Sequence, residues 1–447
     1  MVSIERVLGQ IKGDLAAVFS EEHLTQICRE AGATWRARTL TPVITIYVFL
    51  LQVLHRNTAM TDLPRLSGQV FTPSAYCQAR QRLPVAALRR LLHETGLPLP
   101  ADRSPGAAPA AGGWRGHRTW LVDGSSCSMP DTPALRKQFG LPPGQKPGCG
   151  FPVAHLLVLF EVASGRLLDI LISPWRTNDF RRVAELHPWL RPGDVLIADR
   201  GFCSYTHLAQ LHQRGVHVVF RLRAPHSVDF RPPRAAAARG RLRCRRLARC
   251  GQRDQLVLWQ RPEYVSRMQT ASEHADLPAY LVVRELHYRI RTPGFRTRQV
   301  TLVTTLLNPA DYPGGALAEL YRGRWQAETN LRHLKQTLGL AVLHSRTVAG
   351  VEKEILVFGI VYNLVQSRRA TAAAEQQVPH ETISFLDAWR QLRWPLRTTA
   401  PPDLWVNPAR PDRYEPRYRK RRPPSYPLMT RPRAVLRRQM RHRNDAA

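Results

Sequence analysis

The sequence predicts an α/β protein in which helices cover a mixed β-sheet. Residues 1 to about 97 show the apolar spacing of helices, and strand-like runs alternate with short helices between residues 117 and 223. A basic, β-rich stretch from 224 to 300 interrupts this alternation. The order strand, strand, strand, helix, strand, helix, strand is typical of a three-layer α/β core.

The N-terminal helices carry many basic side chains. The stretch "EEHLTQICREAG" ends at Gly32, and "TPSAYCQARQRLPVAALRRLLHETG" begins with residues that commonly cap helices. Such a basic helical region can bind DNA, and it can equally be a plain bundle whose arginines are solvated. The segment from Leu99 to Gly116 is rich in Pro, Ala and Gly, which predicts a linker.

The predicted core begins after this linker. The run "TWLVD" ends at Asp123 and "DVLIAD" ends at Asp199, while "ASG" joins two apolar runs as in a hairpin. The core resumes after the insertion with "VTLVTTLL", a helix from near Gly315 and the apolar helix "EKEILVFGIVYNLVQSRRAT". From Arg410 onward basic residues and prolines predominate, which predicts an extended tail.

The charge of the chain indicates a polyanionic partner. The formal net charge is +32 and the pI is about 11.1, and so much positive charge repels itself unless a polyanion lies nearby. Nucleic acid is the first candidate, because each phosphate contact releases a counterion, and an anionic membrane surface is the second. No membrane span is predicted, since the longest apolar run, Val43 to Leu54, is shorter than the roughly 20 residues that cross a bilayer.

The N-terminal sequence and the cysteines indicate a reducing compartment. Charges interrupt the first residues throughout, so no secretory signal peptide is predicted. The seven cysteines are scattered and include no CxxC pair, which argues against disulfides and a zinc site. Cys244 and Cys250 could chelate a metal only with further ligands. We therefore expect a cytoplasmic protein.

The segment "YRGRWQAETNLRHLK", residues 321–335, combines an acid with a rare lysine. Lys335 is one of only six lysines among 66 basic residues. In a continuous helix, at about 100° per residue, Tyr321, Arg324, Glu328 and Lys335 share a stripe about 60° wide at the edge of the apolar face. Side chains there can be held firmly and still face a cleft. The alternative is a surface pair, because Arg324 and Glu328 have the i,i+4 spacing of a salt bridge.

Three carboxylates are candidate metal ligands. Asp123 and Asp199 follow apolar strands, where an acid either caps a turn or lines a cleft at the rim of the sheet. Together with Glu328 they can hold two Mg²⁺ ions about 3.5–4 Å apart, which activate a water or a 3′-hydroxyl for phosphodiester cleavage. The sequence contains no GxxxxGK[ST] loop and no HExxH motif that would indicate a different chemistry.

These motifs resemble those of the IS4-type DDE transposases. "LVDGSS" is similar to the block with the family's first aspartate, "VLIADRGFCSY" to the block with the second, and residues 321–335 match the Tyr-x2-Arg-x3-Glu-x6-Lys signature in full. "PSAYCQARQRL" and "RKRRPPSYPLMTRPR" also resemble the family, so the likeness spans most of the chain. It implies an RNase H-like mixed five-stranded sheet with flanking helices.

The resemblance and the composition together divide the chain into six parts. The separation of Asp199 and Glu328 is too long for a loop and requires an inserted β domain, as the family has at this position. The predicted parts are a helical N-terminal domain that could bind DNA (1–98), a linker (99–116), the first part of the RNase H-like core (117–223), the basic β-rich insertion (224–300), the second part of the core with the glutamate-bearing helix (301–375) and a C-terminal basic tail (376–447).

The resemblance implies cut-and-paste DNA transposition. A water cuts the DNA at the ends of the element, and the freed 3′-hydroxyls then attack the partner strand or the target. Asp123, Asp199 and Glu328 would be the catalytic residues and would bind Mg²⁺, for which Mn²⁺ can substitute.

The implied partners are double-stranded DNA and a second copy of the chain. The DNA comprises the terminal inverted repeats of the element and the target, and two copies would act in the synaptic complex, in the bacterial cytoplasm at the nucleoid. Guanidinium, ammonium and phenol groups suit phosphates. The residues expected to contact DNA are Tyr321, Arg324, Lys335 and Arg200.

Two rival functions and one departure from the family complete the prediction. A related RNase H-like nuclease would cut without joining, and a domesticated protein would bind DNA without catalysis, although the intact acidic triad argues against the latter. Some family members stack a flipped base on a tryptophan of the insertion. The matching position here is near Val300, which cannot stack, and Trp259 is the tryptophan of this insertion.

Overall fold

The computed structural model describes most of the chain, and its gaps fall mainly in segments rich in Pro, Gly and basic residues. Parts of four predicted segments lie outside the described residues: residues 1–17 of the helical N-terminal region, the linker from 99 to 112, the runs 231–243 and 290–298 of the insertion, and most of the tail. None of the helices in the described part is both long and apolar enough to span a bilayer. The described residues are 18–36, 39–97, 113–143, 149–177, 179–223, 228, 230, 244–265, 270–289, 299–393, 404–406 and 431–444.

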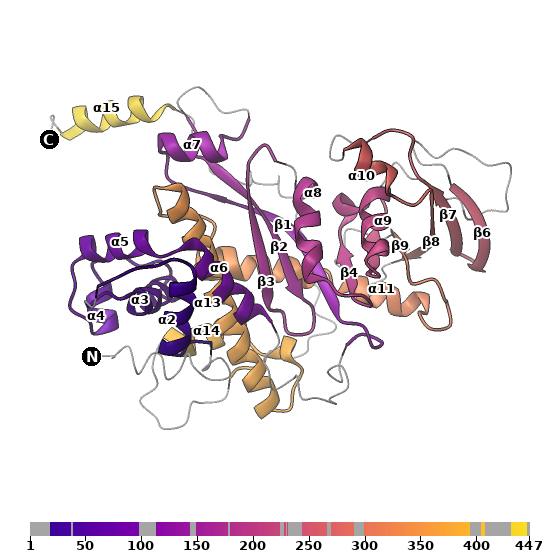
Figure 1. Ribbon diagram of the computed structural model, residues 1–447, viewed down its shortest axis with the longest axis horizontal. Coiled ribbons are helices and arrows are strands. Elements are labelled where there is room, and N and C mark those ends of the chain that lie inside the picture. The colour runs from indigo at the N-terminus through magenta and orange to yellow at the C-terminus, as the bar shows by residue number, and fades with distance from the viewer. Residues whose placement is uncertain are drawn as a thin grey trace.

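Five strands form the centre of the fold in the order β3-β2-β1-β4-β5 (Figure 1). β1, β2 and β3 pair in antiparallel fashion, whereas β4 is parallel to β1 and to β5. This mixed sheet is the one expected for an RNase H-like core, and that prediction is confirmed. The strands are β1 (Thr119–Ser128), β2 (Val153–Glu161), β3 (Leu167–Pro174), β4 (Val195–Ala198) and β5 (His217–Arg221).

The inserted strands continue this sheet. β5 pairs with β9, and the order then runs β9-β8-β7-β6, so one nine-stranded sheet crosses the molecule. The expected five strands are therefore part of a larger sheet, because the outer edge of β5 is hydrogen-bonded to β9 rather than to solvent. The added strands are β6 (Cys244–Gly251), β7 (Asp254–Gln260), β8 (Tyr280–Arg289) and β9 (Gln299–Thr304).

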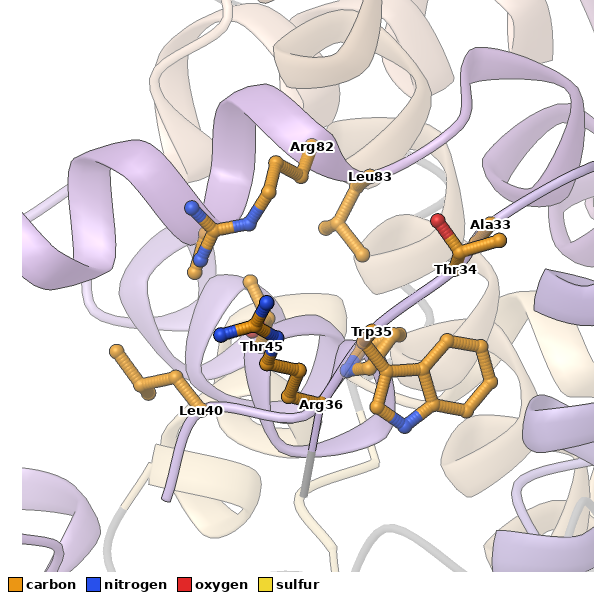
Figure 2. Close-up of a pocket in the computed structure, with 10 residues that line it drawn as sticks. Ala33, Thr34, Trp35, Arg36, Leu40, Thr45, Arg82 and Leu83 are labelled. Atoms are coloured by element: carbon orange, nitrogen blue, oxygen red, sulfur yellow. The ribbon is translucent and has the colours of Figure 1, made fainter. Parts of the chain in front are cut away.

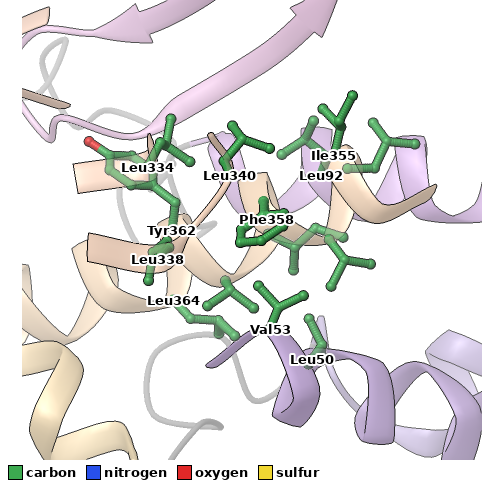
Figure 3. Packing of buried hydrophobic residues seen from close by; sticks show 14 of the residues in the cluster. Leu50, Val53, Leu92, Leu334, Leu338, Leu340, Ile355, Phe358, Tyr362 and Leu364 are labelled. Carbon is green, nitrogen blue, oxygen red and sulfur yellow. The ribbon is translucent and has the colours of Figure 1, made fainter. Parts of the chain in front are cut away.

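The N-terminal helices pack onto one face of the sheet. They share a single apolar core with residues of β1, β2 and β3 and with α13 (Val348–Glu375). Figure 3 shows this core, where Leu50 and Val53 approach Phe358 of α13. The N-terminal helices are α2 (Glu21–Glu30), α3 (Pro42–Leu54), α4 (Leu63–Ser67), α5 (Pro73–Arg82) and α6 (Val85–Gly96).

Close packing at Gly359 explains why α13 can lie against both α6 and β3. A Cβ at this glycine would lie 2.8 Å from Leu92 Cδ1 and 3.0 Å from Leu167 Cδ2, closer than side-chain carbons normally approach. The apolar run that was too short to cross a membrane forms α3, whose residues are mostly buried. That segment is thus a core helix, as predicted.

One arginine of the basic N-terminal stretch is buried rather than solvated. Arg80 on α5 is only 9% exposed, lies 3.7 Å from the centroid of the Phe49 ring and donates through Nη1 to Gln52 Oε1 at 3.1 Å. Lys353 of α13 donates to the carbonyl of Arg80 at 3.1 Å. These contacts fasten α5 to α3 and α13, so Arg80 stabilises the fold and is not available to a partner.

The opposite face of the sheet carries α9 (Tyr205–Gln213) and the 3₁₀ segment Val183–Trp189. Alternation along β1 explains the two layers, because Trp120 and Val122 pack on this side while Leu121 packs on the side of α13. α11 (Gly314–Arg322) covers the face of Ile197 and Val219. By the same alternation, the residues two positions further along these strands face α11 and α12 (Trp325–Arg332). They are Asp123, Asp199 and Arg221.

Three details differ from the predicted elements. A short helix, α7 (Pro133–Phe139), follows β1 and was not predicted. In the stretch 376–447, assigned to the basic tail, α14 (Phe385–Arg393) buries one side against α13, and α15 (Arg433–Asn444) is helical where the sequence from Arg410 onward predicted an extended tail. Prolines and arginines obscure the amphipathic spacing of Phe385, Ala388, Trp389 and Leu392 in α14.

Candidate active site

Asp123 and Asp199 lie side by side at the point where two parallel strands separate. The last paired positions of β1 and β4 are Val122 and Ala198, and the two aspartates are the next residues of each strand. β1 itself does not end at Asp123, as the sequence predicted, but continues to Ser128, paired with β2 and no longer with β4. The acid is therefore inside a strand, yet it opens onto the gap left by β4.

The carboxylate of Asp123 is partly shielded from solvent. Gly124 N donates to its Oδ1 at 2.9 Å, and Nη1 of Arg324 lies 4.0 Å from its Oδ2. Burial raises the pKa of Asp123 from 3.8 to about 6; Gly124 and Arg324 oppose the rise, and the charges of Glu328 and Asp199 add to it. A positive charge bound beside Asp123 would relieve this unfavourable burial.

The segment 321–335 is not one continuous helix. α11 ends at Arg322, Gly323 and Arg324 form a helical junction, and α12 begins at Trp325. From His333 to Leu338 the backbone is π-helical and ends at Gly339 with a φ of 107°. The predicted stripe is therefore interrupted at both ends of α12, because each change of helix type alters the angle per residue.

Arg324 connects the acids. It is only 9% exposed, and its Nη2 donates to Glu328 Oε1 at 3.0 Å while Nη1 faces Asp123. Burial alone would lower the pKa of Arg324, but Tyr321, Glu328 and the two aspartates hold it above its ordinary value. Its Nε is buried and has no hydrogen-bond partner among the described residues, so one N–H of this guanidinium is left unsatisfied.

Tyr321 lies beside this arginine. Its ring centroid is 5.9 Å from Arg324 Cζ, and its side chain is 4% exposed. Burial raises the pKa of the Tyr321 hydroxyl, so the phenol stays protonated and can donate a hydrogen bond. Glu328, in contrast, has a side chain that is 64% exposed and can change its rotamer.

Lys335 lies apart from the acids. Its ammonium is half-buried, which lowers its pKa, and Cys127 is the group that opposes this lowering. Cys127 follows Asp123 by four residues on the same face of β1, about 13 Å along the strand. Within the described ranges, Lys335 Nζ makes no hydrogen bond or ion pair. The structure thus brings Tyr321, Arg324 and Glu328 together with the aspartates, but not Lys335.

A further arginine, Arg221, was not predicted. It ends β5, and the pairing of Ala198 with Phe220 places it next to Asp199, on the other side from Asp123. Its charge lowers the pKa of Tyr321, which shows that the two side chains are close. The sequence does indicate this position, since Arg221 ends the apolar run of the next parallel strand. Its nearness to Asp199 can be inferred only when the order of the strands in the sheet is known.

Arg200 follows Asp199 and is exposed. Its carbonyl accepts from Nε of Arg223 at 3.0 Å, and Arg223 Nη2 donates to the carbonyl of Gly201 at 2.6 Å. Arg223 therefore holds the turn after Asp199 in place, while the guanidinium of Arg200 is presented to solvent.

The two positions of the insertion that were considered for stacking on a DNA base, Val300 and Trp259, are both buried. Val300 lies inside the sheet, and Trp259 is 2% exposed and donates through Nε1 to Glu285 Oε1 at 3.1 Å. Trp259 is a core residue of the insertion and cannot stack on a base in this arrangement. Among the described residues no cysteine takes part in a disulfide, Cys244 and Cys250 included.

The carboxylates suit a hard divalent cation in chemistry but do not yet form a closed ligand set. Three carboxylates provide the oxygen donors that Mg²⁺ prefers. Within the residues that the structure describes, no group of three or more His, Cys, Asp or Glu side chains is arranged to hold an ion. The reason is visible at Arg324, whose guanidinium lies between Asp123 and Glu328 and supplies the positive charge there.

The chain is similar to a known protein family. The profile of the family described as "Transposase DDE domain" matches residues 114–364, more than half of the chain and the part that contains all three acids. The chain belongs to this family of DDE transposases.

Particular relatives come from insertion sequences. The transposase InsG of insertion sequence element IS4 from Escherichia coli (strain K12) is 24% identical over 317 residues, which are 70% of this chain and 65% of that protein. The transposase of IS231D from Bacillus thuringiensis subsp. finitimus is 36% identical over 74 residues, 17% of this chain and 16% of that protein. The chain thus spans less than two thirds of these relatives.

A solved structure of the piggyBac transposase synaptic complex with hairpin DNA superposes with a TM-score of 0.44 and 11% identity. The superposition covers 88% of this chain and 80% of that one.

Proposed function

We propose that this protein is the transposase of an insertion sequence, which cuts DNA at the ends of the element and joins the freed 3′-hydroxyls to target DNA. The observation that carries the proposal is the register of β1 and β4, which aligns Asp123 and Asp199 beneath the Arg324–Glu328 pair. A protein that only binds DNA has no need of two aspartates side by side on neighbouring strands, whereas phosphodiester cleavage uses such a pair to hold metal ions.

Asp123, Asp199 and Glu328 are the residues that would hold Mg²⁺ or Mn²⁺. When bound, such ions activate the attacking oxygen and stabilise the leaving oxygen. The raised pKa of Asp123 supports this assignment, because its carboxylate is poorly solvated and the charge of Arg324 offsets this burial only in part. Glu328 is exposed enough to leave Arg324 and turn toward the aspartates.

Arg324, Tyr321 and Arg221 are the groups that would position the scissile phosphate. The free Nε–H of Arg324 and the protonated hydroxyl of Tyr321 are donors beside the acids, and such donors bind the non-bridging oxygens of a phosphate. Arg200 and Lys335 lie at opposite margins of this group and would contact phosphates further along the strand.

The partners follow from this chemistry. Double-stranded DNA matches the net charge of +32, and a second copy of the chain is needed if two ends are cut and joined together. The main rival is a nuclease of the same fold that cuts without joining.

The test uses purified protein, Mg²⁺ and DNA that carries the inverted repeats flanking the gene. We expect nicks that leave 3′-hydroxyls, followed by joined products, and we expect neither when EDTA replaces Mg²⁺. Cutting without joining would support the nuclease, and tight binding without cutting would support a DNA-binding protein. Normal cleavage by Glu328→Ala would contradict the active-site assignment.

A further inference from the structure

The N-terminal helices contain a pocket of about 460 Å³, lined mostly by apolar and small residues together with two arginines and one tryptophan. It lies between the segment that links α2 to α3 and the end of α5, on the part of the fold outside the matched family region. Its lining residues include Trp35, Arg36, Leu40, Arg82 and Leu83, and no acid is among them.

Two guanidinium groups reach this pocket from opposite walls. Figure 2 shows Arg82 extending from the end of α5 and Arg36 from the loop segment below it, with Leu83 and Trp35 toward the other side. Both arginines are exposed, and neither makes a hydrogen bond or ion pair within the described part of the chain. Unpaired guanidinium groups that face one space favour a phosphate, because they can bind its oxygens in bidentate fashion.

The indole of Trp35 gives the pocket an apolar wall. Cζ of Arg29 lies 5.7 Å from the centroid of this ring, so a third guanidinium stands beside the pocket. Leu40 and Leu83 extend the apolar surface. A pocket of this size exceeds the need of a single inorganic ion and fits a small-molecule-sized group with one anionic end.

We propose that this pocket is a second DNA contact, in which one backbone phosphate lies between Arg36 and Arg82 and its deoxyribose packs against Trp35. The proposal rests on the proposed function for the identity of the ligand, and it adds a site remote from the carboxylates. It also accounts for a group of charges that would otherwise repel one another across an open space.

The experiment measures DNA binding without cleavage, so that its outcome is independent of the catalytic assignment. A fluorescein-labelled duplex is titrated with protein in EDTA at several salt concentrations. For the double variant Arg36→Gln/Arg82→Gln we expect an approximately tenfold weaker affinity and a salt dependence lower by about 1 in log–log slope, the value for one phosphate contact. Arg214→Gln, an exposed arginine at the end of α9 on the other face of the sheet, is the matched control and should change neither.

Two further measurements make the result decisive. Trp35→Leu should weaken binding and Trp35→Phe should largely restore it, while the thermal midpoint of all variants should stay near that of the original protein. An unchanged slope in the double variant, with the fold intact, would overturn the proposal. Displacement of the duplex by an equal concentration of deoxyadenosine monophosphate would assign the pocket to a free nucleotide and would overturn it as well.

Discussion

The two halves of the segment 321–335 occupy different surroundings. In the first half, Tyr321, Arg324 and Glu328 stand over the two aspartates at the point where β1 and β4 separate. In the second half, His333 stacks on Phe385 at 4.2 Å between centroids and Lys335 faces Cys127. A single signature therefore contains a part that gathers charge around the candidate site and a part that anchors the helix in the core.

The largest effect is expected in the first half. Glu328→Gln and Asp123→Asn each remove a negative charge without changing shape, and we expect Mg²⁺-dependent cleavage to fall about 10³-fold or more, since metal stabilisation of the transition state is worth several kcal/mol. The rate of 3′-hydroxyl formation in a single turnover measures this. Glu319→Gln, an exposed glutamate of α11, is the control, and an equal loss there would remove the distinction between the two positions.

Arg324→Lys should have the next largest effect. Lysine cannot face Asp123 and Glu328 with separate N–H groups and also retain the free Nε–H, so we expect cleavage to fall about 100-fold. The same single-turnover assay applies. Arg322→Lys, on an exposed side chain of the same junction, should retain the original rate. If both variants cleaved DNA at the same rate, the contacts of Arg324 with Asp123 and Glu328 would not contribute to cleavage.

The sequence predicted the ingredients of this site better than their arrangement. Residue types, the succession of strands and helices around Asp199 and the presence of an insertion all follow from patterns along the chain. The break at Gly323 and the π-helical turn at 333–338 do not, because helix type depends on tertiary packing of Leu334 and Leu338 against α13. The role of Arg221 required knowledge of which strand lies beside β4.

His333 offers a test of the anchoring half through pH. Burial lowers its pKa to about 4, with Arg369 and Arg332 adding to the effect, so the folded protein keeps this imidazole neutral while the unfolded chain protonates it near 6.5. The free energy of unfolding should therefore decline as the pH falls from about 6.5 toward 4, with His333 contributing about 2 kcal/mol of that loss.

The variant His333→Phe isolates this contribution. Phenylalanine keeps the stack on Phe385 and cannot be protonated, so urea unfolding at pH 7 and pH 5 should show a smaller loss of stability than in the original protein. Cleavage at neutral pH should stay within a few-fold of the original. Identical pH dependence in the two proteins would mean that His333 is not desolvated.

Among the charged residues of the segment 321–335 considered for cleavage, Lys335→Arg should have the smallest effect. The ammonium is half-buried beside β1 with room for a compact charge, and a guanidinium there would shift toward solvent. We expect cleavage to fall about tenfold, chiefly through weaker DNA binding, and Lys137→Arg on α7 to leave it unchanged. An unaltered rate in Lys335→Arg would place Lys335 with the anchoring residues alone.

The continuity of the sheet has a mechanical consequence. Residues 219–221 of β5 are hydrogen-bonded to β9. The insertion therefore cannot move as a separate rigid body without breaking these hydrogen bonds. We expect a displacement of β6 or β7 to pass through β8 and β9 to β5, the strand that carries Arg221 next to Asp199. A force on the far edge of the sheet is therefore expected to reach the candidate site, to which the insertion is joined by hydrogen-bonded strands.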